Sequence, residues 1–131
     1  MRRYLLDTCV LIWLLSEDRR VKEISEDIRY FQGDYAVSTI TIMELLYLIQ
    51  SGKLQMDISF DNLINLLKSR DIKIEETDRE SLRVLSELPF FKKHPDPFDR
   101  VIIATAITEN RILISGDHNF SLYKRLNFLQ I

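Results

Sequence analysis

The sequence predicts an α/β fold with a central, mostly parallel sheet and helices on both of its faces. Short apolar segments with strand character alternate along the chain with longer segments of helical periodicity. Strands separated by helices need crossover connections, which make neighbouring strands parallel and place the helices on the sheet faces. The 131 residues, 46% of them hydrophobic, suffice for one buried core and contain no internal repeat. We therefore expect a single domain over residues 1–131.

The expected strands are short apolar runs, and a helix precedes or follows each of them. We expect strands at residues 3–6, 35–38, 72–75, 111–115 and 126–131, and helices at 9–15, 21–31, 42–49, 61–70, 77–88 and 98–106. Ile24, Ile28 and Phe31 fall on one face of the second helix, which is otherwise polar. Gly33 and Gly52 interrupt the helical pattern and separate the elements around them.

The starts of two later helices are marked by capping signals. Thr77 and Glu80 have the spacing of a capping box, so we expect them to open the helix that Pro89 ends. Asp96 is suited to the N-cap of the next helix, and Pro97 to its first position, where a missing N–H costs nothing. Asp99 then lies in the first turn, near the positive end of the helix.

Four acidic residues are expected at the same edge of the sheet. Asp7 follows the first strand, Glu44 lies in the first turn of the helix after the second strand, Asp99 begins the helix before the fourth strand, and Asp117 follows that strand. In parallel α/β sheets, sites form at the carboxyl ends of the strands. Each acid also has a purely structural interpretation: helix cap for Asp7, capping box with Thr41 for Glu44, helix dipole for Asp99 and turn residue for Asp117.

Together the acids indicate a cation site. Carboxylates that converge without a cation repel one another and raise each other's pKa values. An all-oxygen cluster selects hard divalent ions, Mg²⁺ or Mn²⁺, rather than zinc. Such ions activate water and neutralise charge that develops on a phosphodiester, which is the chemistry of metal-dependent nucleases.

The segments that carry these acids resemble the PIN-domain family, and within it the VapC-type toxins of type II toxin–antitoxin pairs. They are Leu5-Leu6-Asp7-Thr8, the run from Ser38 to Leu45, the run from Asp96 to Ala106, and the run from Ile112 to Asp117. The resemblance implies a three-layer α/β/α sandwich, with Asp7, Glu44, Asp99 and Asp117 as metal-holding and catalytic residues. Thr8 and Ser115 match polar neighbours that would orient the carboxylates or the activated water. A further acid, common in relatives soon after the fourth, is replaced here by His118-Asn119.

The same resemblance implies an activity and partners. The protein would cleave RNA as a Mg²⁺- or Mn²⁺-dependent endoribonuclease, as a homodimer held in check by a small VapB-like antitoxin. The apolar helix with Leu45, Leu46, Leu48 and Ile49 would then either contribute to the dimer or antitoxin groove or lie in the core.

Composition limits the class of protein and its location. The net charge of −2 excludes binding of nucleic acid by a general basic excess. The single cysteine, Cys9, allows no intrachain disulfide and favours a reducing compartment. The apolar run near the N-terminus is interrupted by Asp7 and is too short to span a bilayer, so we expect a cytoplasmic protein without membrane attachment.

Other polar residues near the acids are weaker candidates. His94 and His118 are interpreted as loop histidines without a catalytic part, although His118 could act as a general acid. Lys92, Lys93 and Arg100 could contact phosphates, but basic residues on loops are more often only solvated.

Two other classes of function compete with the nuclease hypothesis. The first is a PIN-like module that binds partners or acts as a scaffold without catalysis. The second is a Mg²⁺-binding receiver-like phospho-acceptor domain, which is disfavoured because Asp7 has no acidic neighbour and no suitable lysine follows a late strand. A haloacid-dehalogenase-like phosphatase would need an Asp at the position of Cys9.

Overall fold

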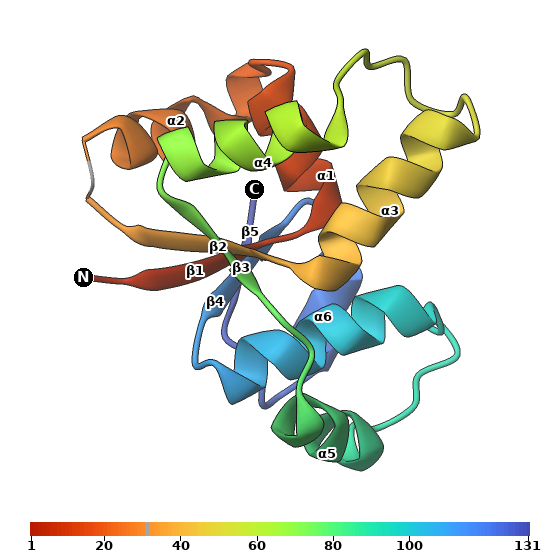
Figure 1. Ribbon diagram of the computed structural model, residues 1–131. Helices are drawn as coiled ribbons and strands as arrows, with labels where there is room; N and C mark the ends of the chain where they lie inside the picture. The colour runs from red at the N-terminus through yellow and green to blue at the C-terminus, as the bar shows by residue number, and fades with distance from the viewer. Residues whose placement is uncertain (31) are drawn as a thin grey trace.

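The computed structural model describes residues 1–30 and 32–131 and consists of a parallel sheet between two helical layers (Figure 1). The sheet has five strands in the order β3-β2-β1-β4-β5. The strands are β1 (Arg3–Leu6), β2 (Asp34–Ser38), β3 (Ile72–Glu75), β4 (Ile112–Ser115) and β5 (Phe128–Gln130). This architecture confirms the predicted three-layer α/β/α sandwich, and all four strand pairings are parallel.

The helices lie close to their predicted positions. They are α1 (Thr8–Leu15), η1 (Arg19–Val21), α2 (Lys22–Arg29), α3 (Thr39–Gln50), α4 (Phe60–Ser69), α5 (Arg79–Glu87), α6 (Pro97–Thr108) and η2 (His118–Leu122), where η denotes a 3₁₀-helix. The predicted helix 21–31 is therefore divided between the end of η1 and α2, and its last residue, Phe31, lies outside the described residues. None of the described helices is long and apolar enough to cross a membrane.

Alternating side chains of the strands build two separate cores. Leu6, Val37 and Ile114 pack with α1, α2, α3 and α4 on one face of the sheet. Their neighbours Leu5 and Leu113 pack with α5 and α6 on the other face. This alternation follows from the period of two in a β-strand, and it fixes the strand register because a slip of one residue would exchange the two faces. Figure 1 shows α5 and α6 on the side of the sheet opposite to α2 and α4.

The helix starts show which capping signals are used. Asp96 caps α6 as predicted, since its carboxylate accepts hydrogen bonds from the backbone N–H groups of Phe98 and Asp99, at 2.8 and 3.3 Å. The predicted cap of α5 is wrong by one residue. Asp78, rather than Thr77, accepts from the Ser81 N–H at 2.9 Å. The Asp78 carboxylate accepts a second hydrogen bond, from the Ser81 hydroxyl, at 3.0 Å, which favours the later start.

The order of the strands places a topological switch point, the position at which parallel α/β sheets form a ligand crevice, at the carboxyl edge. The chain passes from β1 to β2 and β3 on one side, and then returns to place β4 and β5 on the other side of β1. The direction of winding therefore reverses between β1 and β4, which is the position at which ligands bind in such sheets. Asp7 directly follows β1, and Asp117 lies two residues beyond the end of β4.

A buried arginine ties together three strands away from this crevice. Arg111, which precedes β4, is only 2% exposed. Its guanidinium donates to the Tyr4 carbonyl at 3.2 Å, to the Asp34 carboxylate at 3.1 Å and to the Glu75 carboxylate at 2.7 Å. All of these partners accept from one fixed fork of donors, so Arg111 holds β1, β2 and β3 in position relative to β4.

Candidate metal centre

Asp7 is buried at the end of β1 and is held from β4. Its side chain is 7% exposed, and its Oδ2 accepts a hydrogen bond from the Ser115 hydroxyl at 2.7 Å. The Ser115 Oγ also accepts from the Asp117 backbone N–H at 3.1 Å. Burial raises the pKa of Asp7, and the hydrogen bond from Ser115 opposes this shift without cancelling it. Asp7 stands at the N-cap of α1 without a capping hydrogen bond from its side chain, and its Oδ2 accepts instead from the Cys9 thiol at 3.6 Å, so helix capping does not explain it.

Glu44 reaches the same edge from α3. It lies in the second turn of the helix and not in the first, because Ser38 caps α3 and the helix already begins at Thr39. The Thr8 hydroxyl donates a hydrogen bond to Glu44 Oε1, which joins α3 to the start of α1. Burial raises the pKa of Glu44, and the negative charge of Asp7 adds to the shift. The capping-box interpretation with Thr41 is excluded, since Thr41 is an interior residue of the helix.

The pKa of Asp99 is strongly raised by its surroundings. It lies in the first turn of α6, where the helix dipole favours a carboxylate by up to about 1 kcal/mol. Burial nevertheless raises its pKa to about 8, with further contributions from the charges of Asp7, Asp96, Glu44 and Asp117. The effect of Asp7, Glu44 and Asp117 on one carboxyl group shows that the four predicted acids lie within electrostatic range of one another. The structure thus places all four predicted acids within electrostatic range, and it brings ligand atoms of Asp99 and Asp117 within 4.8 Å of each other and of His94.

The two carboxylate oxygens of Asp117 have different partners. Oδ1 caps η2 by accepting from the Asn119 N–H at 2.9 Å, as expected of a turn residue. Oδ2 instead lies 3.7 Å from Nε2 of His94. The purely structural interpretation therefore accounts for only one oxygen.

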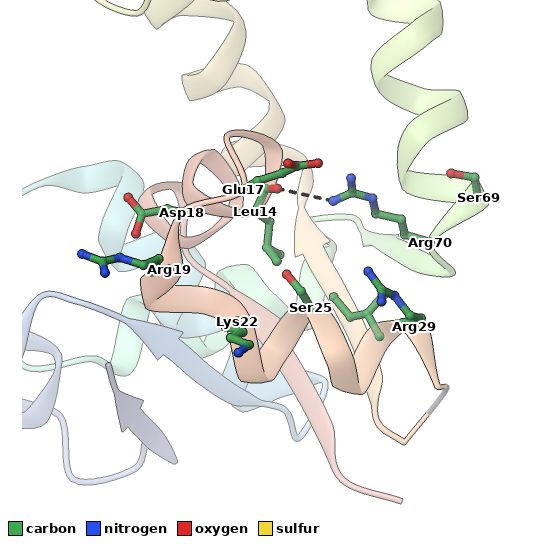
Figure 2. Close-up of a pocket in the computed structure, with 10 residues that line it drawn as sticks. Leu14, Glu17, Asp18, Arg19, Lys22, Ser25, Arg29, Ser69 and Arg70 are labelled. Carbon is green, nitrogen blue, oxygen red and sulfur yellow. Dashed lines mark hydrogen bonds between the residues drawn. The ribbon is translucent and has the colours of Figure 1, made fainter.

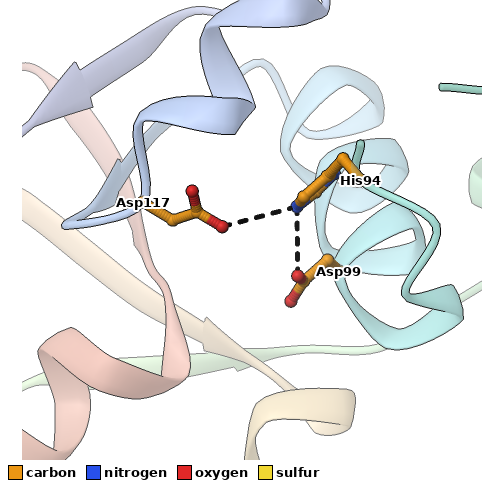
Figure 3. Close-up of side chains that lie close together, drawn as sticks. All are labelled: His94, Asp99 and Asp117. Carbon is orange, nitrogen blue, oxygen red and sulfur yellow. Dashed lines mark ion pairs between the residues drawn. The ribbon is translucent and has the colours of Figure 1, made fainter. Parts of the chain in front are cut away.

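His94 is the functional candidate that sequence reasoning dismissed. His94 lies in the loop before α6, as predicted, but its side chain is only 4% exposed and its Nε2 lies 3.1 Å from Asp99 Oδ2. Figure 3 shows the imidazole directed between the carboxylates of Asp99 and Asp117. The useful signal was its place two residues before the cap of α6, which keeps it close to Asp99. His118, by contrast, is exposed.

The basic residues beside the cluster have different surroundings. Lys92 and Lys93 are exposed. Arg100 is half-buried and donates to the Pro89 carbonyl at 2.8 Å, while its guanidinium lies over the Phe90 ring at 5.4 Å. Arg100 therefore stabilises the loop before α6, whereas the two lysines have no such assigned contact within the described part of the chain.

The donor set fits a divalent cation. Buried carboxylates with raised pKa values are costly unless protons or a cation neutralise them. Ligand atoms from His94, Asp99 and Asp117 all lie within 4.8 Å of one another, which is compatible with a shared ion. Carboxylate oxygens suit Mg²⁺ and Mn²⁺, and an imidazole nitrogen adds a ligand typical of transition metals.

A cavity of about 600 Å³ lies elsewhere, between the end of α1, η1, α2 and the end of α4 (Figure 2). Its lining includes Glu17, Arg29 and Arg70, and Arg70 donates to the Leu14 carbonyl at 3.4 Å. Leu14 is six residues beyond Thr8 on α1, a separation of about 9 Å along a helix. The cavity is therefore separate from the acidic cluster.

Comparison with known proteins places the chain in a family. The sequence matches the PIN domain family over residues 4–126. The structure is similar to VapBC2 from Rickettsia felis bound to a DNA fragment from their promoter, with a TM-score of 0.74, 18% identity and 98% of both chains covered. DNA-bound VapBC from Salmonella typhimurium gives a TM-score of 0.71 at 19% identity, covering 99% of this chain and 98% of that one. A toxin–antitoxin complex from Klebsiella pneumoniae gives 0.66 at 20% identity, covering 98% and 99%. No curated protein sequence matches at a significant level. With this fold and a family match over most of its length, the chain belongs to the PIN domain family.

Proposed function

We propose that this protein is a metal-dependent endoribonuclease of the VapC type, acting in the cytoplasm as the toxin of a toxin–antitoxin pair. One observation carries the proposal: Asp7, Glu44, Asp99 and Asp117 converge at the carboxyl edge of a PIN-family sheet, and burial with mutual repulsion raises the pKa of Asp99 to about 8. The full-length similarity to VapBC structures and to a toxin–antitoxin complex supports the assignment to this type.

In this proposal the four acids hold Mg²⁺ or Mn²⁺, which would supply Lewis-acid polarisation of the phosphodiester and activation of water. The side chains around the acids orient the carboxylates that would hold the cation. Ser115 donates to Asp7 Oδ2 and fixes the orientation of that carboxylate. Thr8 does the same for Glu44 by donating to Oε1. In this proposal both hydroxyls position the carboxylates that hold the metal.

The test compares metal binding and cleavage in matched variants. Protein stripped with EDTA is titrated with Mn²⁺ and Mg²⁺, and the midpoint of thermal unfolding and the cleavage of labelled RNA and DNA are measured. At a hundredfold excess over Kd, a cation bound only to the folded state adds about 2.7 kcal/mol of stability. We expect Asp7→Asn to abolish both this stabilisation and RNA cleavage. Asp61→Asn, which changes an exposed acid in the first turn of α4, should leave both intact.

The result that contradicts the proposal is equally clear. Cleavage by Asp7→Asn at the wild-type rate would refute the assignment of the site. A flat response of both proteins to metal, with no cleavage of RNA, would favour the alternative of a non-catalytic binding module. Cleavage of DNA alone would retain the nuclease site and refute the substrate.

For the partners, we propose a homodimer and a small VapB-like antitoxin that contact the exposed part of α3. Leu45 is fully buried, and Leu46 and Ile49 pack against the same core, so the core accounts for most of the apolar excess predicted for this helix. Met43 and Tyr47 remain 54% and 57% exposed. Light scattering of the purified protein should give twice the chain mass, and Tyr47→Asp should lower it toward that of the monomer. A monomeric wild-type protein at micromolar concentration would refute the homodimer.

A further inference from the structure

His94 is held from behind by residues of the segment that follows β4. Its Nδ1 lies 3.0 Å from the Tyr123 hydroxyl, and the same hydroxyl donates to the His94 carbonyl at 3.3 Å. The Phe120 ring packs edge-on against the imidazole, with 4.8 Å between ring centroids. The backbone is fixed as well, since the His94 N–H donates to the Phe91 carbonyl at 3.0 Å. The ring is therefore rigidly oriented with Nε2 toward the acids.

The hydrogen-bond network assigns the tautomer of His94. A phenol hydroxyl has one proton, and Tyr123 donates it to the His94 carbonyl. Nδ1 must then be the donor to the Tyr123 oxygen, which leaves a lone pair on Nε2 of the neutral ring. A metal-ligating histidine usually donates its other ring N–H to an acceptor behind it, as His94 does to Tyr123.

Nε2 lacks the partner that a buried nitrogen requires. It is close to Asp99 Oδ2 at 3.1 Å and to Asp117 Oδ2 at 3.7 Å, yet neither contact has hydrogen-bond geometry, and no other partner is found in residues 1–30 and 32–131. An unpaired buried polar atom costs about 1–3 kcal/mol. Figure 3 shows this atom at the apex between the two carboxylates. The surroundings of Nε2 are thus those of a nitrogen whose lone pair binds a cation.

We propose that Nε2 of His94 is a direct ligand of the divalent cation, together with Asp99 and Asp117. Ligands about 2.1 Å from one ion are about 3.0 Å apart at a right angle and about 4.2 Å apart when opposite. The observed separations of 3.1 and 3.7 Å from Nε2 to the two carboxylates fall in this range. The inference rests on the proposed metal-dependent function and deepens it by adding a nitrogen to the oxygen ligands.

A nitrogen ligand changes the metal preference of the centre. Mg²⁺ is bound almost entirely through oxygen and gives up its waters reluctantly, whereas imidazole is a common ligand of first-row transition metals. The centre therefore favours Mn²⁺ over Mg²⁺ more strongly than carboxylates alone would.

The decisive experiment uses Mn²⁺ as a spin probe. The chain has only two histidines, His94 and His118, so an imidazole signal has two sources. Wild-type protein is loaded with Mn²⁺ after EDTA treatment, and electron spin echo envelope modulation is recorded for the intact chain. We expect ¹⁴N modulation typical of a directly bound imidazole. Replacing all histidine by ¹⁵N-histidine, which alters no residue, should convert it to the ¹⁵N pattern.

Two variants assign the signal to one residue. His118→Gln, a control at an exposed position, should retain the modulation, and His94→Gln should lose it while its Mn²⁺ dissociation constant rises about tenfold. The affinity for Mg²⁺ should change less, so the preference for Mn²⁺ falls. Circular dichroism tests whether His94→Gln is folded, and the isotope experiment does not depend on that variant.

The outcomes separate this inference from the proposed function. Mn²⁺ binding that needs Asp99 but shows no ¹⁴N modulation in the wild type would overturn the role of His94 and leave the metal centre standing. Modulation that survives in His94→Gln would overturn it as well. If the wild type binds no Mn²⁺, or if Asp99→Asn binds it equally well, both proposals are overturned.

Discussion

Replacing Asp99 by Asn should make the metal-free protein more stable at neutral pH. Burial and the charges of neighbouring acids raise the pKa of Asp99 from 3.8 to about 8. A carboxyl group with a raised pKa in the folded state keeps its proton there while the unfolded chain has already released it. The folded state then binds more protons, so the free energy of unfolding falls as pH rises from about 4 to about 8. Asn has the same shape and no charge to lose.

The magnitude follows from the pH interval. Between 3.8 and 7 the linkage corresponds to about 4 kcal/mol at about 1.36 kcal/mol per pH unit. The Asp99 side chain retains 22% exposure, and solvent screening reduces this to about 2 kcal/mol. For a chain of this size, the corresponding rise in melting temperature at pH 7 is about 6–10 °C. At pH 4 the folded wild type keeps the Asp99 proton and the unfolded chain has released it only in part, so the gain should fall below about 1 kcal/mol.

The assay is thermal unfolding by circular dichroism in EDTA at pH 4, 5.5, 7 and 8. Asp61→Asn is the matched control, because it alters an exposed acid in the first turn of α4 and should cost about 0.3–1 kcal/mol of helix-dipole stabilisation. Added Mn²⁺ should stabilise the wild type and not Asp99→Asn. If Asp99→Asn melts below the wild type at pH 7, as the control does, the repulsion inferred for the cluster is wrong.

Other substitutions test the scaffold around the site. Arg111→Met should cost about 3–5 kcal/mol in urea unfolding, because it leaves two carboxylates without their buried cation, whereas the exposed Arg83→Met should change stability by less than about 1 kcal/mol. An equal effect of both would contradict the role assigned to Arg111. Gly116→Ala should lower stability by about 1–3 kcal/mol, since its Cβ would meet the Trp13 ring at 2.7 Å; an unchanged melting temperature would show that the ring moves freely. Ser115→Ala removes the hydroxyl that joins the ends of β1 and β4 and should cost about 1–2 kcal/mol in the same assay; no loss would mean that water replaces it.

Features governed by neighbouring residues could be predicted from the sequence. The strand predicted at 111–115 is β4 at Ile112–Ser115, because an apolar run between polar residues is sufficient to define it. The start of α6 was predicted from Asp96 and Pro97, whose capping chemistry acts within one turn. The expected convergence of the acids needed only the alternation of strands and helices along the chain and the rule that parallel strands share a carboxyl edge.

Features that depend on distant contacts could not be predicted in this way. His94 is buried by Tyr123, which lies 29 residues later, and no local pattern encodes that contact. Glu44 meets Thr8 across 36 residues, and its place in the second turn follows from an earlier helix start than the apolar pattern indicated. The cap of α5 was misplaced because two overlapping signals, Thr77 with Glu80 and Asp78 with Ser81, differ by one residue.

The chain treats its buried and half-buried acids in two opposite ways, and this contrast is the strongest physical argument for a cation beside Asp99. Asp34 forms ion pairs with Arg3, Lys73 and Arg111 at 3.6, 3.2 and 3.1 Å. Burial would raise its pKa, but the hydrogen bonds and charges of Arg111 and Lys73 lower it overall. At the crevice, burial and repulsion prevail, and within residues 1–30 and 32–131 no lysine or arginine forms an ion pair with Asp99. A chain that supplies internal cations at one place and omits them at another leaves the second to be neutralised from outside, which is what a metal-binding centre requires.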